Sequence, residues 1–245
     1  MTPRQTDYQA RKDRVLAIVV DEYVENIAPI GSSLIVKRYH LDLSPATVRN
    51  ILAELEEEGY LTHPHTSAGR MPTQRGYRYY VDHLMHEIKL LEEEKAHIQK
   101  EYIQGVKELQ DLLENASQVI SDLTHYTSIV SVDGGDEVFC RGLSFVAGYP
   151  EFHNFDRIKQ LLYILEGKER ILELISRELE HKVEILIGSE MQFEGMDDCS
   201  LVISSYKKKN SALSGKIAVL GPTRMDYERV VSTLNYISDL MSRIL

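Results

Sequence analysis

A short polar run at residues 44–50 carries side chains of the types that read base edges in double-stranded DNA. Asn50 can donate to and accept from adenine, and Arg49 can donate to guanine or to a phosphate. Ala46 and the methyl group of Thr47 can contact a thymine methyl group, and both residues are small enough to allow close approach. If one helix presents these residues outward, the run predicts a DNA-reading face.

The segment at residues 61–81 contains three arginines and no acidic residue. Guanidinium groups that contact phosphates set affinity and register rather than sequence preference. The loop at residues 63–70 has neutral donors suited to the DNA backbone or minor groove. The residues that we expect to contact DNA are Ser44, Ala46, Thr47, Arg49, Asn50, His65, Thr66, Ser67, Arg70, Arg75 and Arg78.

Each feature alone also has an ordinary structural explanation. Arg49 could pair with Glu56 or Glu57 on its own helix, and Asn50 could be a solvated helix residue. The two histidines of the loop could suggest a metal pair, but they are separated by one proline and lack further ligands at a suitable spacing. The order of the features along the chain favours DNA binding over these separate explanations.

Three predicted helices position the polar run. Apolar spacing predicts helices at residues 13–27 and 33–40, and the third, at residues 45–58, has an N-cap serine at 44, proline at its first position and glycine after its end. Val48, Leu52 and Leu55 form its inward stripe. A strand at residues 60–62, the loop, and a helix capped by Thr73 follow. This order predicts a winged helix-turn-helix.

Length, charge and hydropathy narrow the class of protein. The chain has 245 residues and a formal net charge of −10, of which residues 1–86 carry −1 and residues 87–245 carry −9. An acidic protein must approach a polyanion along a local cationic strip. No apolar stretch predicts a membrane span or a signal sequence, and Cys140 and Cys199 have no ligand spacing, so we expect a cytoplasmic protein without a disulfide or metal.

Beyond the first domain, the pattern predicts a helical connector and an α+β domain. Positions 84 to 123 repeat apolar residues at alternating steps of four and three, which is typical of a dimerising seam or of a helical hairpin bent near Gly105. Strands are expected at residues 138–146, 183–187, 201–206 and 216–220, with helices at 155–180 and 223–244. The predicted domains are 1–82, 83–128 and 129–245. No catalytic arrangement has a diagnostic spacing, so we expect neither an enzyme nor a cofactor.

Several longer strings resemble one family closely. Residues 29–32 (PIGS), 44–50 (SPATVRN), 64–73 (PHTSAGRMPT) and 76–82 (GYRYYVD), with 150–152, 187–190 and 221–225 in the second part, are similar to the HrcA heat-inducible transcription repressors. The resemblance covers almost the whole chain. It implies a C-terminal GAF-like domain and a homodimer that binds an inverted-repeat operator, the CIRCE element, ahead of chaperone operons. It also implies release on heat shock, when a GroEL-type chaperonin that keeps the repressor active is withdrawn.

The chain departs from this family at two places. Ile51 stands where an acidic residue is usual, which predicts a slightly altered outer helix face. Between residues 130 and 138 the chain lacks the first part of the GAF-like fold and the inserted dimerising domain. We therefore expect the seam and the stripe from Val230 to Met241 to supply the dimer contact. A small-molecule-sensing regulator with a GAF-like pocket is the alternative function.

Overall fold

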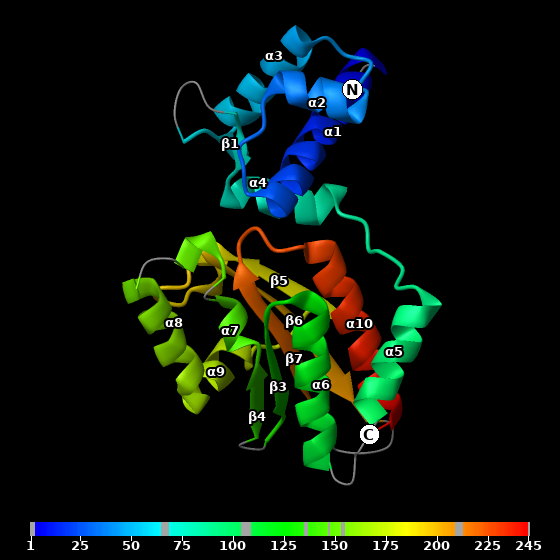
Figure 1. The fold of residues 1–245 in the computed structure, drawn as a ribbon, viewed down its shortest axis with the longest axis vertical. Coiled ribbons are helices and arrows are strands. Elements are labelled where there is room, and N and C mark those ends of the chain that lie inside the picture. The colour runs from blue at the N-terminus through cyan, green and yellow to red at the C-terminus, as the bar shows by residue number, and fades with distance from the viewer. Residues whose placement is uncertain are drawn as a thin grey trace. The chain divides into compact units, whose positions relative to one another are not determined.

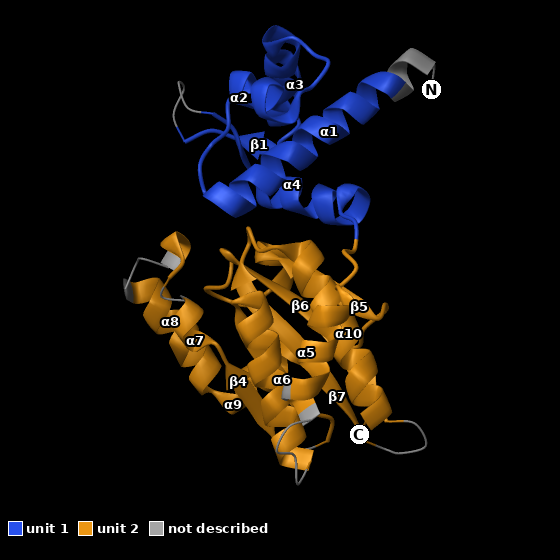
Figure 2. Cartoon of the chain, turned by 45° about the vertical axis from the view of Figure 1, so that its right-hand side comes forward, with its two compact units in different colours: residues 1–86 blue, residues 87–245 orange. Residues whose placement is uncertain are grey.

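The computed structural model describes residues 3–64, 69–103, 109–134, 137–146, 148–152, 155–208 and 213–244. It divides into two compact units, Met1–His86 and Glu87–Leu245 (Figure 2). Helices and two separate antiparallel sheets make up the chain, so the predicted α+β class is confirmed. The division differs from the expected three parts, because residues 87–128, predicted as a separate connector, belong to the second unit.

Three helices form most of the first unit. They are α1 (Pro3–Asn26), α2 (Ser32–Tyr39) and α3 (Pro45–Glu57). Helix α1 begins at Pro3, ten residues earlier than predicted. The apolar spacing did not reveal these ten residues, because they are mostly polar and show no apolar period. The three helices share one core, to which α1 contributes Leu16 and Val19, α2 contributes Ile35, and α3 contributes Val48 and Leu52.

A two-stranded ribbon follows the helices of the first unit. Strand β1 (Leu61–Thr62) pairs antiparallel with β2 (Met71–Pro72), and Ile30 extends the ribbon through two backbone hydrogen bonds with Arg70, of 3.0 and 2.9 Å. Helix α4 (Gln74–Tyr79) is capped by Thr73, whose hydroxyl accepts from the Gly76 amide at 3.1 Å. The π-helix η1 (Tyr80–Leu84) continues α4. The ribbon therefore lies between two capped helices, as the turn residues predicted.

The second unit is built on a five-stranded antiparallel sheet in the order β4-β3-β7-β6-β5 (Figure 1). Its strands are β3 (Thr127–Val132), β4 (Val138–Arg141), β5 (Val183–Ile187), β6 (Cys199–Lys207) and β7 (Ser214–Pro222). Helices α6 (Leu109–Thr124) and α10 (Tyr227–Ile244) cover one face, and α8 (Phe155–Glu166) and α9 (Lys168–Ile175) cover the other. Because both faces are covered, β6 and β7 are buried along most of their length.

Two strand predictions need correction. The strand predicted at residues 138–146 ends at Arg141, because Gly142 has φ of +80° and turns the chain into the short helix α7 (Leu143–Val146). Strand β3 was not predicted at all, although it pairs with both β4 and β7. The family resemblance implies a missing domain between β3 and β4. In this chain the two strands instead pair directly, through four consecutive residue pairs.

The predicted seam is used inside the second unit. Helix α5 (Glu92–Ile103) packs on α6, and the seam positions Ile98, Tyr102 and Ala116 are at most 1% exposed. This arrangement supports the hairpin alternative, although Gly105 lies outside the described residues. The stripe of α10 that we expected in a dimer contact is fully buried against the sheet: Val230, Leu234, Ile237 and Met241. The stripe of α10 is therefore not free to form that contact, whereas the seam keeps Leu91 and Leu109 exposed, at 67% and 37%.

Candidate nucleic-acid interface

The amino end of α3 is fixed by an N-cap. Ser44 has an extended backbone, and its hydroxyl accepts a hydrogen bond from the Thr47 amide at 3.1 Å. Pro45 occupies the first helical position, where its missing amide hydrogen costs nothing. Ala46, Arg49 and Asn50 are exposed, and Thr47 is half-buried. Across the described residues, neither Arg49 nor Asn50 has a side-chain hydrogen bond or ion pair.

The opposite face of α3 fixes the direction of that polar end. Four apolar side chains of this 13-residue helix are at most 5% exposed and pack it into the core of the first unit: Val48, Ile51, Leu52 and Leu55. Ile51 is therefore core, and the prediction that it alters the outer face is wrong. An apolar side chain suits this buried position, since an unpaired carboxylate there would carry a desolvation cost.

Glu56 ties α3 to the ribbon. Its carboxylate accepts from Arg70 at 2.7 Å and also contacts His63. The ion pair considered for Arg49 is thus made by Arg70 from the ribbon, which leaves Arg49 available. The same pair neutralises part of the charge of the cationic strip, because the Arg70 side chain is 22% exposed and lies on a carboxylate. The sequence did not reveal this pairing, since Glu56 lies outside the acid-free segment.

The other two arginines of the strip differ from each other. Arg78 pairs with Asp82 one helical turn later, at 2.9 Å, and is half-buried. Arg75 is exposed and stacks over the Tyr60 ring, with 4.8 Å between the guanidinium carbon and the ring centroid. In the part of the chain that the structure describes, Arg75 has no carboxylate partner. Arg75 is therefore the arginine of the strip whose charge is most available to a phosphate.

Three of the predicted contacts cannot be placed. His65, Thr66 and Ser67 lie outside the described residues, in the loop that joins β1 to β2. The described residues on either side of that loop are Pro64, which is exposed, and Gly69, which is packed against Ile30 so closely that a Cβ atom would lie 2.5 Å from the Ile30 carbonyl carbon. The base of the loop is thus fixed by close backbone contact.

Polar networks behind the helices hold the first unit together. The buried Glu22 accepts from Arg38 at 2.9 Å and from the Tyr39 hydroxyl at 2.6 Å, so α1 and α2 are joined by a satisfied carboxylate. Tyr8 donates to Glu54 at 2.7 Å, and this hydrogen bond, with burial, raises the pKa of Tyr8 to about 12. Both glutamates are therefore satisfied by partners from α1 or α2.

Comparison with known proteins assigns the chain to a family. A family model described as the HrcA protein C terminal domain matches residues 131–231. The heat-inducible transcription repressor HrcA of Carboxydothermus hydrogenoformans is 31% identical, over 96% of this chain and 97% of the relative. The chain belongs to the HrcA family. The HrcA of Pelotomaculum thermopropionicum is 30% identical over 96% of each chain. These family members are named as transcription repressors, not as enzymes.

This HrcA family member is short. The alignment with the Carboxydothermus relative has 334 positions, which exceeds the 245 residues of this chain by 89, so at least 89 positions of the relative have no counterpart here. A crystal structure described only as a hypothetical protein shares the fold, with a TM-score of 0.72 and 19% identity over 95% of this chain and 97% of that one. No described helix is long and apolar enough to cross a membrane.

Proposed function

We propose that this chain is a cytoplasmic transcription repressor that binds double-stranded DNA through a winged helix-turn-helix. In this proposal α2 crosses the DNA backbone, α3 enters the major groove with its amino end first, and the β1–β2 ribbon is the wing. The observation that carries the proposal is the exposed pair Arg49 and Asn50, both without partners in the described chain, on a helix whose other face is locked in the core.

Each residue of the interface has a distinct expected role. Asn50 pairs with an adenine, Arg49 contacts guanine or phosphate, and Ala46 and Thr47 lie against a thymine methyl group. Arg75 contacts a phosphate. Arg70 and Arg78 can reach phosphates only at the expense of their pairs with Glu56 and Asp82, so we expect them to contribute less. The proposed wing contacts His65, Thr66 and Ser67 remain as predicted from the sequence.

The family supports a finer proposal about the operator and its control. We propose a homodimer on an inverted-repeat operator of the CIRCE type ahead of chaperone operons, released on heat stress, with a GroEL-type chaperonin as partner. The DNA-binding unit would be residues 1–86, and residues 87–245 would be a reduced GAF-like regulatory unit. Two reading heads related by a two-fold axis match an operator of that symmetry. Static light scattering at micromolar concentration should give the mass of a dimer, and a monomer would contradict it.

The experiment that tests DNA binding is a footprint and mobility-shift titration on the DNA upstream of the protein's own gene. We expect a protected inverted repeat, with protection shifted to higher protein concentration in Asn50→Ala and unchanged in Arg14→Ala. Arg14 is a suitable control because it is an exposed arginine of α1 without an ion-pair partner in the described chain. Equal binding to a shuffled duplex, or equal loss in both variants, would contradict a reading role for α3.

A second candidate function is a repressor controlled by a small molecule. The observation that favours it is an open groove in the second unit with a mixed polar and apolar lining. A ligand that binds only the folded state raises the melting temperature, whereas control by a chaperonin needs no such ligand.

A further inference from the structure

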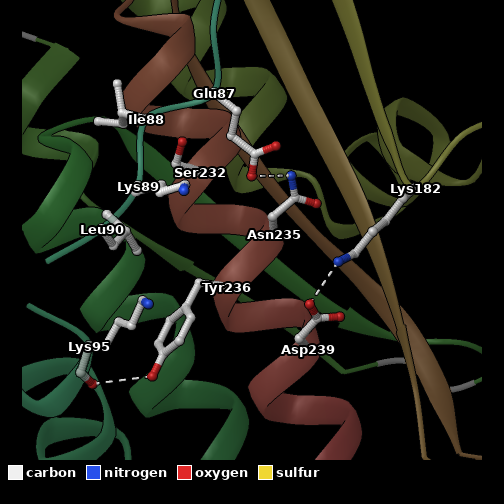
Figure 3. A pocket seen from close by; sticks show the side chains of 10 residues that line it. All are labelled: Glu87, Ile88, Lys89, Leu90, Lys95, Lys182, Ser232, Asn235, Tyr236 and Asp239. Carbon is white, nitrogen blue, oxygen red and sulfur yellow. Dashed lines mark hydrogen bonds and ion pairs between the residues drawn. The ribbon is translucent and has the colours of Figure 1, made fainter. Parts of the chain in front are cut away.

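A groove of about 550 Å³ lies in the second unit, between the segment Glu87 to Leu90 and one side of α10 (Figure 3). Lys95 of α5 and Lys182, just before β5, complete its lining. The volume falls within the range that holds small organic ligands. Its residues play no part in the proposed DNA interface.

The acidic side chains of the groove are already engaged. Glu87 accepts from the amide nitrogen of Asn235 at 3.0 Å, and Asp239 pairs with Lys182 at 2.8 Å (Figure 3). Lys89, in contrast, is exposed and has no ion-pair partner in the described chain. The second unit carries 27 acidic and 18 basic residues, and Lys89 differs from other unpaired lysines of that unit in lining a groove, where its charge can attract an anion.

The groove also has apolar walls that an inorganic ion would not use. Leu90 is 7% exposed, and beside it lies the Tyr236 ring, fixed because its hydroxyl donates to the Lys95 carbonyl at 3.4 Å and accepts from Gln99 at 3.0 Å. Ile88 remains 36% exposed on the same segment. A ring or short hydrocarbon chain would cover these side chains and gain free energy from their burial.

The polar network of the groove is incomplete. The amide nitrogen of Asn235 is used by Glu87, but its carbonyl oxygen Oδ1 is buried without a hydrogen-bond donor in the part of the chain described. Buried acceptors of this kind are rare and costly. A donor brought in with a ligand, after a small adjustment of the neighbouring side chains, would complete the network.

We propose that this groove binds a small organic anion, with a carboxylate or phosphate at Lys89 and a ring or short hydrocarbon body against Leu90 and Tyr236. Such a ligand would also hold the segment Glu87 to Leu90, which directly follows His86, the last residue of the first unit. It would thereby restrict the chain that links the two units. A resulting change in operator affinity rests on the proposed function, whereas binding itself does not.

Calorimetric titration of the full chain tests the site without DNA, using phenyl phosphate, inorganic phosphate and benzyl alcohol as probes. We expect phenyl phosphate to bind at least about tenfold more tightly than either of the others, because only it has both the charge and the ring. Lys89→Ala should weaken it about tenfold, while Lys159→Ala should not. Lys159 is the matched control because it is an exposed lysine of α8, without a partner in the described residues.

Trypsin supplies a second readout, because Lys89 lies in a segment without helix or strand. Phenyl phosphate should slow cleavage after Lys89 at concentrations that saturate the calorimetric site. Equal affinity for phenyl phosphate and inorganic phosphate, insensitivity to Lys89→Ala, or no binding at about 10 mM would each overturn the proposal. None of these experiments includes DNA, so their results do not bear on the proposed DNA binding. Failure of this site and failure of the proposed function can therefore be told apart.

Discussion

Helices α3 and α10 have the same kind of apolar spacing but opposite fates. Helix α3 buries one face and leaves its amino end open, with Ala46, Arg49 and Asn50 exposed. Helix α10 is buried along most of its 18 residues, including Ser232, Thr233 and Ser238. An apolar stripe therefore predicts that one face of a helix will be buried, but it does not predict whether the same chain or a second copy will bury it. The composition of the remaining face is the better guide to function.

The largest effect on stability should come from truncating a buried side chain in the apolar stripe of α10. Leu234→Ala removes a side chain that is 0% exposed and is expected to lower the free energy of unfolding by about 2 to 5 kcal/mol. Urea denaturation followed by circular dichroism measures it, with Arg49→Ala, expected within about 0.5 kcal/mol of the parent, as the exposed counterpart. A loss below about 1 kcal/mol for Leu234→Ala would show that the α10 stripe is not closely packed against the sheet.

Asn50→Ala should show the reverse pattern. We expect a loss of about 1 to 3 kcal/mol in binding to the protected operator and a relaxed preference at one base position, with unfolding unchanged. Competition between the operator and duplexes altered at single positions measures this effect. Uniform weakening on all duplexes would assign Asn50 to the backbone and would remove the distinction between reading and anchoring residues on α3.

Arg75→Ala sharpens the same distinction from the anchoring side. Its guanidinium is exposed over Tyr60, so its removal should weaken all DNA sequences alike and reduce the slope of log affinity against log salt by about 0.9. Titrations at several salt concentrations give the slope, with Arg14→Ala as the control. Arg70→Ala should change the slope less, because Glu56 already neutralises that charge. A sequence-dependent loss for Arg75→Ala would contradict a pure phosphate role.

Residues that cap or end helices made much of the first unit predictable. Ser44, Pro45, Gly59 and Thr73 each act within one helical turn, and the structure places the cap bonds of Ser44 and Thr73, and the left-handed Gly59, where the residue types indicate. The partner of Arg70 was not predictable, because Glu56 is fourteen residues away and meets it only when the ribbon folds onto α3. Long-range pairing leaves no local trace in the sequence.

The second unit was harder for the same reason. Its β3 strand is polar at three of six positions (Thr127, Ser128 and Ser131) and shows no clear alternation, and it pairs with β7, almost ninety residues later, as well as with β4. The seam of α5 and α6 was visible, but periodicity could not distinguish a contact with a second copy from one within the unit. Helix existence followed from local spacing, whereas the choice of packing partner depended on the whole sheet.

The smallest effect at neutral pH, and the one that separates the two regions by pH, concerns Tyr206 on β6. Burial raises the pKa of its hydroxyl, which also donates to the Ser131 carbonyl at 2.8 Å. In the unfolded chain a tyrosine ionises near pH 10. The stabilisation is therefore complete below about pH 10 and is lost as pH rises toward the folded pKa, since the unfolded state then binds fewer protons.

Tyr206→Phe should accordingly cost about 1 kcal/mol at pH 7, from the lost hydrogen bond, and should make unfolding less pH-dependent above about pH 10, by up to about 1.4 kcal/mol per pH unit. Urea denaturation at pH 7 and between about pH 10 and 11 measures both numbers. Because Tyr206 is 1% exposed in the sheet of the second unit, the substitution should leave operator affinity at pH 7 unchanged, whereas Asn50→Ala changes only that affinity. An unaltered alkaline slope would mean that Tyr206 ionises in the folded protein as it does in the unfolded chain, and hence that the sheet beneath α10 is open to water at this residue.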